Sequence, residues 1–442
     1  MKAIFSPRFS MRFRFAYLRL PLVLILVNTV WFIKIPSAYE SIYAEDGFVY
    51  LSDALNKPIL NELANTYAGY AGTIGRIGGL FAALFPLKYA ATALVFFASM
   101  IISSIVLVTY ANTQKPLKSK VVRLGLSAAI ILLPIANSES IATVCNLYNF
   151  LFFGAFVVVI SMRDSSKPGI LGFSILLLGA LSNPLTVFLL AIPLLRYMIL
   201  RLQNRAFKIA TVEWMLAFGL LAHTLIVILD TTKETRIPFE TFSLEKVVYL
   251  FLDRVIGSSL VPGWGLVSGT AGSPGFENSF WLFESLTLRL AITTILYIFF
   301  SGYAIWFIKT SEETHTRTEF LPAFVLWHVY IFVTGFFYNV EPRYSIFSSL
   351  LFLWLLGFLV SNSKLKVEIG NVLPVLFFSI VVLSGAISQP SQLRISGPVW
   401  ADELVKAKLT CKEGGSQLVE IRILPMNSVR LVVVDCSRIK DN

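Results

Sequence analysis

The sequence predicts an all-α polytopic membrane protein with about eleven transmembrane helices, loops on the outer face and a small C-terminal α/β tail. Of its 442 residues, 56% are apolar and only 14% are charged, whereas charged residues make up about a quarter of a soluble globular domain. The mean hydropathy is +0.73, and several apolar stretches exceed the length that a core helix needs. Too few polar side chains are available to cover the apolar surface, so the composition excludes a soluble enzyme.

The formal net charge of +11 means something different in this class than in a soluble protein. A soluble protein so basic would suggest binding to nucleic acid. In a membrane protein, excess Lys and Arg marks cytoplasmic loops and contact with anionic lipid, so we expect membrane lipid and no nucleic acid among the partners. Three Cys and three His are too few for a disulfide framework or a histidine-rich metal site.

The first predicted helix follows a basic N-terminus. Five basic residues among the first 19 precede an apolar run from Leu20 to Ile33. A secretory signal would show a small-x-small cleavage site after the run, and none is evident, so we predict a retained helix with a cytoplasmic N-terminus. Ten further apolar segments lie near 89–111, 122–137, 146–162, 169–182, 184–196, 210–229, 287–308, 320–338, 344–360 and 371–388.

The segments 169–182 and 184–196 are each shorter than a typical span, with a turn signal at Ser182-Asn183-Pro184 between them. Counted as two passes, they leave 19 of the 37 basic residues in cytoplasmic segments. Counted as one pass, they would place the basic cluster from Arg196 to Lys208 outside, against the positive-inside rule. We therefore predict two passes, and whether both are full spans stays open.

The chain divides into a transmembrane domain, residues 1–388, and an external tail, residues 389–442. Two long loops face outward: loop 1, residues 35–88, and loop 2, residues 230–286, whose Gly- and Pro-rich run from Pro262 to Gly275 predicts either a mobile flap or a plain connection.

The tail combines a Trp-bearing segment with two strand-like runs, Leu418 to Leu424 and Val429 to Val434, around a turn signal at 425–428. A hairpin would bring Cys411 and Cys436 together, and in an oxidising compartment we expect them to form a disulfide. The alternative is a disordered tail with free thiols.

Two adjacent carboxylates, Glu45 and Asp46, lie in loop 1 before Gly47. At a membrane surface such a pair can supply a general base. The structural alternative is that Asp46 caps a helix from Phe48 to Leu55.

The basic N-terminus, the single helix and the Glu45-Asp46-Gly47 signature resemble the polytopic glycosyltransferases of the GT-C fold. Gly69-Tyr70, the run from Arg76 to Leu80, and Pro342-Arg343-Tyr344 point the same way. The resemblance implies an inverting transferase in a bacterial inner membrane, with its active site and C-terminus external. Its donor would be a polyprenyl-phosphate sugar and its acceptor a glycan, a glycolipid or a protein. It also implies that Asp46 is the base and Glu45 the neighbouring candidate. Some members use a divalent metal, but no ligand cluster here requires one, so we expect no cofactor.

A leaving phosphate needs cationic donors, and the planar fork of arginine suits its oxygens. Arg76 lies among five glycines, and Arg343 lies in a short outer loop. We expect both to bind the donor phosphate, with Tyr70 and Tyr344 beside the substrate. The alternatives are a small-residue packing face around Arg76, and a salt bridge to Glu341 or interfacial snorkelling for Arg343.

Polar residues near helix ends complete the candidate set. Glu139, Asn146 and Asn149 could bind sugar hydroxyls, although capping of the following helix is the alternative we favour for the asparagines. Among the ionisable groups inside apolar segments, we expect Glu213 to pair with the nearby basic cluster. We expect His223 and His328 to be hydrogen-bonded packing residues.

The predicted function is therefore sugar transfer from a polyprenyl-phosphate donor. The alternative is a transporter or flippase of a lipid-linked saccharide, which the short pair at 169–196 favours. Transporters tend to show inverted repeats and polar sites near the bilayer midplane, and neither is evident in the sequence. A structural membrane subunit would leave the carboxylates of loop 1 without a task.

Overall fold

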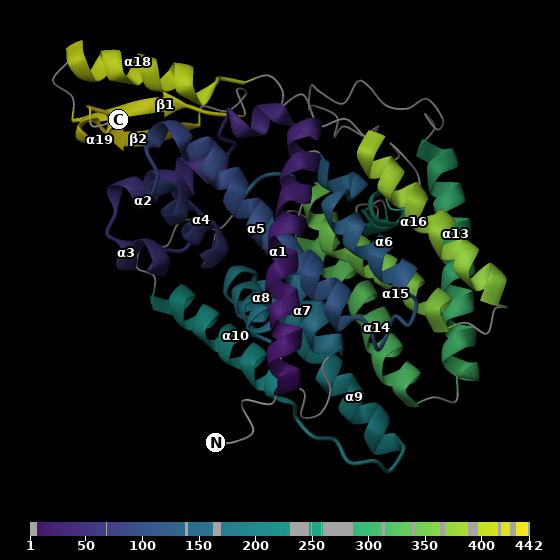
Figure 1. Ribbon diagram of the computed structural model, residues 1–442. Helices are drawn as coiled ribbons and strands as arrows, with labels where there is room; N and C mark the ends of the chain where they lie inside the picture. Colours follow the sequence, from purple (N-terminus) through teal and green to yellow (C-terminus); the bar gives the residue numbers. More distant parts are fainter. Residues whose placement is uncertain are drawn as a thin grey trace.

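The computed structural model describes residues 7–67, 69–137, 140–161, 169–229, 247–248, 250–257, 259, 286–311, 314–337, 342–362, 367–387, 397–413, 417–424 and 430–440. Helices dominate these residues and run side by side in one bundle (Figure 1). A helix occupies each of the eleven predicted positions. These helices are α1 (Pro7–Lys34), α5 (Ala90–Asn112), α6 (Lys120–Ile131), α7 (Leu147–Ser161), α8 (Ile170–Ser182), α9 (Ala191–Leu202), α10 (Thr211–Leu229), α13 (Leu286–Thr310), α14 (Thr314–Phe337), α15 (Ile346–Asn362) and α16 (Val367–Ile387).

Within the described residues, six helical segments are long and apolar enough to cross a membrane: 87–112, 184–202, 211–229, 290–310, 317–335 and 343–362. Three apolar helices are shorter, at 147–161, 170–182 and 374–386. The apolar helices indicate a membrane protein, and the count of eleven spans stays a prediction.

The chain turns between α8 and α9, where the sequence predicted a turn. Helix α8 ends at Ser182, and a 3-10 segment, η5 (Pro184–Leu190), leads into α9. The side chain of Asn183 stabilises this turn because its Oδ1 accepts the backbone N–H of Leu185 at 2.9 Å.

Hydrogen bonds between helix ends divide those ends into two groups. The first group lies on the side of the tail, and we call it the tail-side end. There the amide of Asn149 donates to the carbonyl of Arg343 at 2.9 Å, and Thr73 donates to the carbonyl of Leu181 at 3.1 Å. The N-terminal end of α1 lies at the other side of the bundle from the tail (Figure 1).

At this opposite end, the guanidinium of Arg196 in α9 donates to carbonyls of α7 and α14. The amide of Asn362 in α15 donates to the carbonyl of Pro116, just after α5, at 2.9 Å. Helices α7 and α15 show the same division, since the residues at the start of each bond in the first group and those near the end of each bond in the second.

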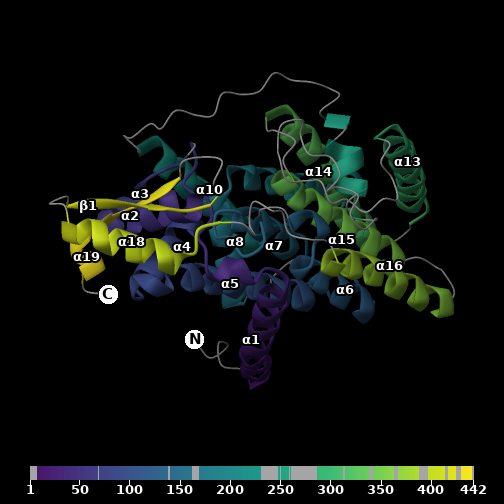
Figure 2. The same ribbon diagram turned by 90° about the horizontal axis from the view of Figure 1, so that it is seen from above.

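Burial differs sharply between helices. The apolar window of α15 is 78% buried, whereas that of α13 is 17% buried. Helix α13 lies at the edge of the bundle (Figure 2) and leaves Phe299 73% and Trp306 56% exposed. Large apolar side chains exposed on such a scale are stable against lipid tails and costly in water.

Loop 1 folds into short helices against the tail-side end. They are η1 (Pro36–Tyr39), a π-helical turn η2 (Asp46–Leu51), α2 (Ser52–Asn56), α3 (Ile59–Ala64), α4 (Thr73–Ala83) and η3 (Leu87–Tyr89). Helix α4 packs closely on Tyr50 through its glycines: a Cβ at Gly79 would lie 2.3 Å from the carbonyl oxygen of Tyr50, and one at Gly75 would lie 2.2 Å from its ring. The glycines near Arg76 therefore form a small-residue packing face.

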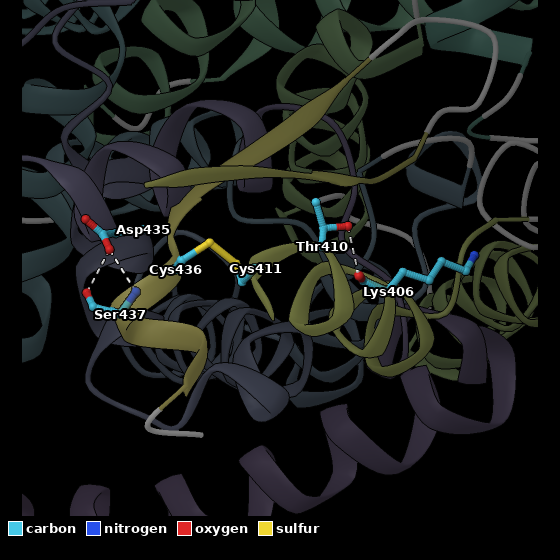
Figure 3. Close-up of a disulfide and its surroundings, with 6 residues drawn as sticks. All are labelled: Lys406, Thr410, Cys411, Asp435, Cys436 and Ser437. Atoms are coloured by element: carbon cyan, nitrogen blue, oxygen red, sulfur yellow. Dashed lines mark hydrogen bonds between the residues drawn. A yellow bond between two sulfur atoms is a disulfide. The ribbon is translucent and has the colours of Figure 1, made fainter. Parts of the chain in front are cut away.

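The tail folds into helix α18 (Trp400–Glu413), strands β1 (Leu418–Arg422) and β2 (Leu431–Asp435), and a short helix α19 (Cys436–Lys440). The strands are antiparallel, with Leu418 opposite Asp435, and Cys411 is bonded to Cys436 (Figure 3). The strand positions agree with the predicted runs to within two residues, and the predicted turn at 425–428 lies outside the described residues.

The tail docks on loop 1. The backbone N–H of Ala44 donates to the carbonyl of Leu424 at 2.7 Å, and the N–H of Leu424 donates to the carbonyl of Ile42 at 3.0 Å. The indole of Trp400, 2% exposed, donates to the carbonyl of Leu87 at 2.7 Å. Loop 1 and the tail therefore form one layer over the helices, and β2 lies beside α2 (Figure 1).

Candidate functional site

Asp46 connects loop 1 to the segment that precedes α7. Its Oδ2 accepts the N–H of Val144 at 2.9 Å, and its Oδ1 accepts the N–H of Cys145 at 2.7 Å. The residue is 3% exposed. These two partners lie about 100 positions further along the chain. The two hydrogen bonds therefore do not cap a helix over 48–55, which was the structural alternative for Asp46. The amide pair fixes the orientation of the carboxylate.

Cys145 adds its thiol to the same carboxylate through a hydrogen bond with Asp46. Burial raises the pKa of the Cys145 thiol, and the negative charges of Asp46 and Glu45 raise it further. The thiol is therefore neutral at physiological pH and is a poor nucleophile.

Glu45 is paired with a residue of the tail. The Nη1 of Arg430 lies 3.1 Å from Glu45 Oε1, and their side chains are 29% and 15% exposed. The same guanidinium lies 5.0 Å from the centre of the Phe48 ring, so it contacts a carboxylate and an aromatic face at once. Arg430 was not among the residues expected from the sequence, because nothing local to it indicates that it meets loop 1.

Arg343 lies in the 3-10 turn η9 (Pro342–Ser345) at the start of α15. The amide of the buried Asn149 donates to its carbonyl at 2.9 Å, which fixes the turn against α7. The Arg343 guanidinium lies 5.2 Å from the centre of the Tyr344 ring. The predicted residues Arg343, Tyr344 and Asn149 are therefore close together.

Tyr70 brings loop 1 to the same place. A tight backbone pairing between Tyr67 and Tyr70, at 2.9 and 3.2 Å, presents it, and its ring centre lies 6.1 Å from that of Tyr148 in α7. Burial raises the pKa of the Tyr70 phenol, assisted by Glu45 and opposed by Arg343. The phenol is therefore a protonated hydrogen-bond donor.

Glu45 and Arg343 both act electrostatically on Tyr70 and also on Cys145. Arg343 and Tyr344 likewise act on Tyr148. These shared neighbours define one cluster at the tail-side end, which we call the acid–arginine cluster: Glu45, Asp46, Tyr70, Cys145, Tyr148, Arg343, Tyr344 and Arg430. Sequence reasoning missed Cys145, Tyr148 and Arg430 in this set.

Arg76 has other partners. Its guanidinium, 1% exposed, donates to Glu62 Oε1 at 2.9 Å, to Asp53 Oδ2 at 3.2 Å and to the carbonyl of Thr66 at 3.2 Å. Burial raises the pKa of Glu62 to about 7, and Arg76 opposes that rise. This arrangement connects three segments of loop 1 and favours a structural role for Arg76 over the predicted phosphate contact.

The remaining predicted residues separate into three groups. The buried Asn146 donates to Thr143 Oγ1 at 3.5 Å. It directly follows Cys145, whose N–H donates to Asp46. Glu139 lies outside the described residues, as does the Gly- and Pro-rich run of loop 2. His223 and His328 are hydrogen-bonded, to the Leu181 carbonyl at 2.9 Å and to the Tyr297 hydroxyl at 3.1 Å, which agrees with the packing interpretation.

Glu213 differs in detail from the expectation. Its Oε2 accepts the N–H of Ala210 at 2.5 Å and so closes the start of α10. Arg196 acts on it electrostatically but as the weakest of its influences.

Among the residues that the structure describes, no group of three or more His, Cys, Asp or Glu side chains could hold a metal ion. No family model matches the chain, and no curated protein matches it.

Proposed function

We propose that this protein is a membrane glycosyltransferase that moves a sugar from a polyprenyl phosphate to a glycan, glycolipid or protein acceptor. The observation that carries the proposal is the acid–arginine cluster. Carboxylates and a tyrosine from loop 1, an arginine and a tyrosine from the start of α15, a tyrosine from α7 and an arginine from the tail meet at one end of an apolar helical bundle. Acid, cation and aromatic rings are the groups that recognise a sugar phosphate.

The reaction assigns a task to each kind of group. An acceptor hydroxyl attacks the anomeric carbon, its proton passes to a carboxylate, and the bond from that carbon to the phosphate oxygen breaks with inversion. Asp46 is the proposed base, because two amide donors hold its carboxylate in one orientation. Arg343 stabilises the negative charge that develops on the departing polyprenyl phosphate.

The tyrosines fit the sugar. Tyr70 and Tyr344 offer ring faces for the apolar side of a pyranose, and Tyr70 keeps its proton for a hydrogen bond. Asn149 supports the site because its side-chain amide donates to the backbone carbonyl of Arg343. Glu45 is proposed to bind a hydroxyl of the acceptor.

A transporter or flippase is the rival class, and the break between α8 and η5 is the feature that suggested it. Two of the polar groups at this break are bonded to the start of α4: the Leu181 carbonyl accepts from Thr73 and also contacts His223, and Ser182 Oγ accepts the N–H of Ile74 at 3.0 Å. The break therefore serves the packing of loop 1, which favours the transferase.

The proposed orientation places the tail-side end outside a bacterial inner membrane and the opposite end in the cytoplasm. It is supported by the basic segments near 115–123 and 196–208, which lie in or next to the opposite end. Reporter fusions at residues 118 and 430 should read cytoplasmic and external, respectively. A cytoplasmic reading at 430 would reverse the orientation.

Gene deletion followed by mass analysis of surface glycans and glycolipids tests the function. Loss of a single sugar, restored by the wild-type gene, supports the transferase. Accumulation of complete lipid-linked saccharides on the cytoplasmic side would instead support a flippase. An unchanged glycan profile, together with purified protein that transfers no sugar from polyprenyl-phosphate donors, would refute the proposal.

A further inference from the structure

The tail contributes a charged side chain to the acid–arginine cluster. Arg430 lies just before β2, 385 positions after Glu45, and contacts it at 3.1 Å. Because Arg76 is occupied by Glu62 and Asp53, Arg430 and Arg343 are the arginines that the described residues place in this cluster.

The ion pair is not needed to hold the tail in place. The backbone bonds between Leu424 and loop 1 and the Trp400 indole bond act independently of it. Asn56 also donates to the Val433 carbonyl at 2.7 Å, and the Val433 N–H donates to Ser52 Oγ at 3.1 Å. A partly exposed ion pair adds little to stability, so docking alone does not explain why Arg430 meets Glu45.

The geometry of Arg430 is suited to orienting a carboxylate. Phe48 supports one face of the guanidinium at 5.0 Å, which restricts where its Nη1 can point. Glu45 accepts from Nη1 through Oε1, and its neighbour along the chain is the amide-bound Asp46. Arg430 therefore fixes the second carboxylate of the pair, as the backbone amides fix the first.

We propose that Arg430 is a positioning residue that holds the Glu45 carboxylate in place to bind the acceptor hydroxyl beside Asp46. This inference rests on the proposed function, since it assigns Glu45 to the acceptor. Arg430 acts through Glu45 and touches neither the donor nor the reacting atoms. The tail is accordingly a working part of the transfer site.

The test uses full-length protein purified in detergent, with wild type compared with Arg430→Met, Arg430→Lys, Glu45→Gln and the double variant Glu45→Gln/Arg430→Met. Methionine keeps length and apolar contact with Phe48 while removing the charge. The matched control is Lys406→Met, which breaks an exposed ion pair with Glu403 elsewhere in the tail. Transfer is measured over a range of acceptor concentrations, and limited proteolysis reports whether the tail stays docked on loop 1.

We expect Arg430→Met to keep a protease-resistant tail and a wild-type melting temperature. Its kcat/KM for the acceptor should fall about 10- to 100-fold, in the range expected for a mispositioned group, while the KM for the donor is unchanged. Arg430→Lys should recover part of the loss. The acceptor kcat/KM of the double variant should be no lower than that of Glu45→Gln, because both changes remove the same interaction.

Three results would overturn the inference while leaving the transferase intact: an acceptor kcat/KM for Arg430→Met equal to that of Lys406→Met, losses that multiply in the double variant, or a donor KM that rises instead of the acceptor KM. A tail that becomes protease-sensitive in Arg430→Met would show that the ion pair only holds the tail, which also overturns it. A wild-type protein without transfer activity removes the proposed function and, with it, the positioning role.

Discussion

The two ends of the helical bundle use charged side chains in different ways. At the opposite end, the charges close helix ends: the guanidinium of Arg196 donates to the carbonyls of Val159, Ile160 and Thr318 at 3.1, 2.6 and 3.2 Å, and Glu213 accepts a backbone N–H at the start of α10. At the tail-side end, charges of both signs gather with tyrosines from segments far apart in the chain.

This difference distinguishes charged side chains that stabilise the fold from charged side chains that we assign to the proposed site. A charge whose bonds all go to backbone carbonyls has its desolvation offset by the bonds that it makes, and the fold accounts for it. Glu45 and Arg430 instead pair between loop 1 and the tail, and Arg343 lies against the Tyr344 ring, so we propose these three residues as members of a site. Arg76 lies at the tail-side end but belongs with Arg196, because its partners are all within loop 1.

Arg76→Met gives the largest expected effect and tests this assignment. The change leaves Glu62, 0% exposed, without its cation, and breaking a buried ion pair costs about 3–5 kcal/mol. We expect a correspondingly lower free energy of unfolding, measured by denaturation in detergent. The control is Lys57→Met, which removes an exposed partner of Asp53 and should cost less than about 1 kcal/mol. A stable Arg76→Met protein that has lost donor binding would return Arg76 to the phosphate site.

The pH dependence of stability sharpens the same point. Burial raises the pKa of Glu62 from 4.5 to about 7, so the folded state binds its proton more tightly than the unfolded state. Protonation of Glu62 therefore contributes fully to the free energy of unfolding below about pH 4.5, and this contribution is lost as the pH rises to about 7. The shift corresponds to about 3 kcal/mol at most. Unfolding of wild type should show this fall relative to Glu62→Gln, and parallel pH curves for the two proteins would contradict it.

The sequence allowed the helices to be located but not the contacts between distant segments. Apolar runs, the turn at Ser182–Pro184 and the tail hairpin depend on neighbouring residues. The two strands were predicted to within two residues, whereas α1 begins 13 residues before the predicted Leu20 and α6 ends six residues before the predicted 137. The partners of Arg76 and Glu45 lie 10 to 385 positions away. Nothing in the local pattern specifies such pairings, so Arg430 was missed and Arg76 was assigned to the donor from its glycine-rich surroundings.

Asp46→Asn tests the base. Asparagine offers one acceptor oxygen, whereas Asp46 accepts two backbone N–H groups, so the variant also places two donors against each other and loses stability. Measured well below its own melting temperature, transfer should still fall at least ~10²-fold. The exposed Glu420→Gln in β1 should match wild type. Transfer near the wild-type rate in the folded variant would show that Asp46 only anchors loop 1, and Glu45→Gln would then identify the base.

Arg196→Met tests the opposite end. It removes the three bonds to helix carbonyls, and unsatisfied buried acceptors cost about 1–3 kcal/mol in total when solvent can reach part of the site. We expect a lower melting temperature with normal transfer at low temperature. The control is Arg201→Met, an exposed arginine in the last turn of α9, which should change neither. A loss of transfer in folded Arg196→Met would contradict the assignment of a purely structural role to the charged residues of the opposite end.

Arg343→Lys is the most conservative change and the smallest expected effect. Lysine keeps the positive charge but not the planar fork that binds two phosphate oxygens and stacks on an aromatic ring, as the Arg343 guanidinium does 5.2 Å from the centre of Tyr344. The backbone of residue 343 stays bound to Asn149, so the fold should be unchanged. We expect donor kcat/KM to fall about tenfold, while acceptor KM stays constant. Arg422→Lys, an exposed arginine of β1, provides the control for a generic Arg-to-Lys exchange. Equal donor kinetics in the two variants would remove Arg343 from the phosphate site and leave the tail-side end without a cation for the leaving group.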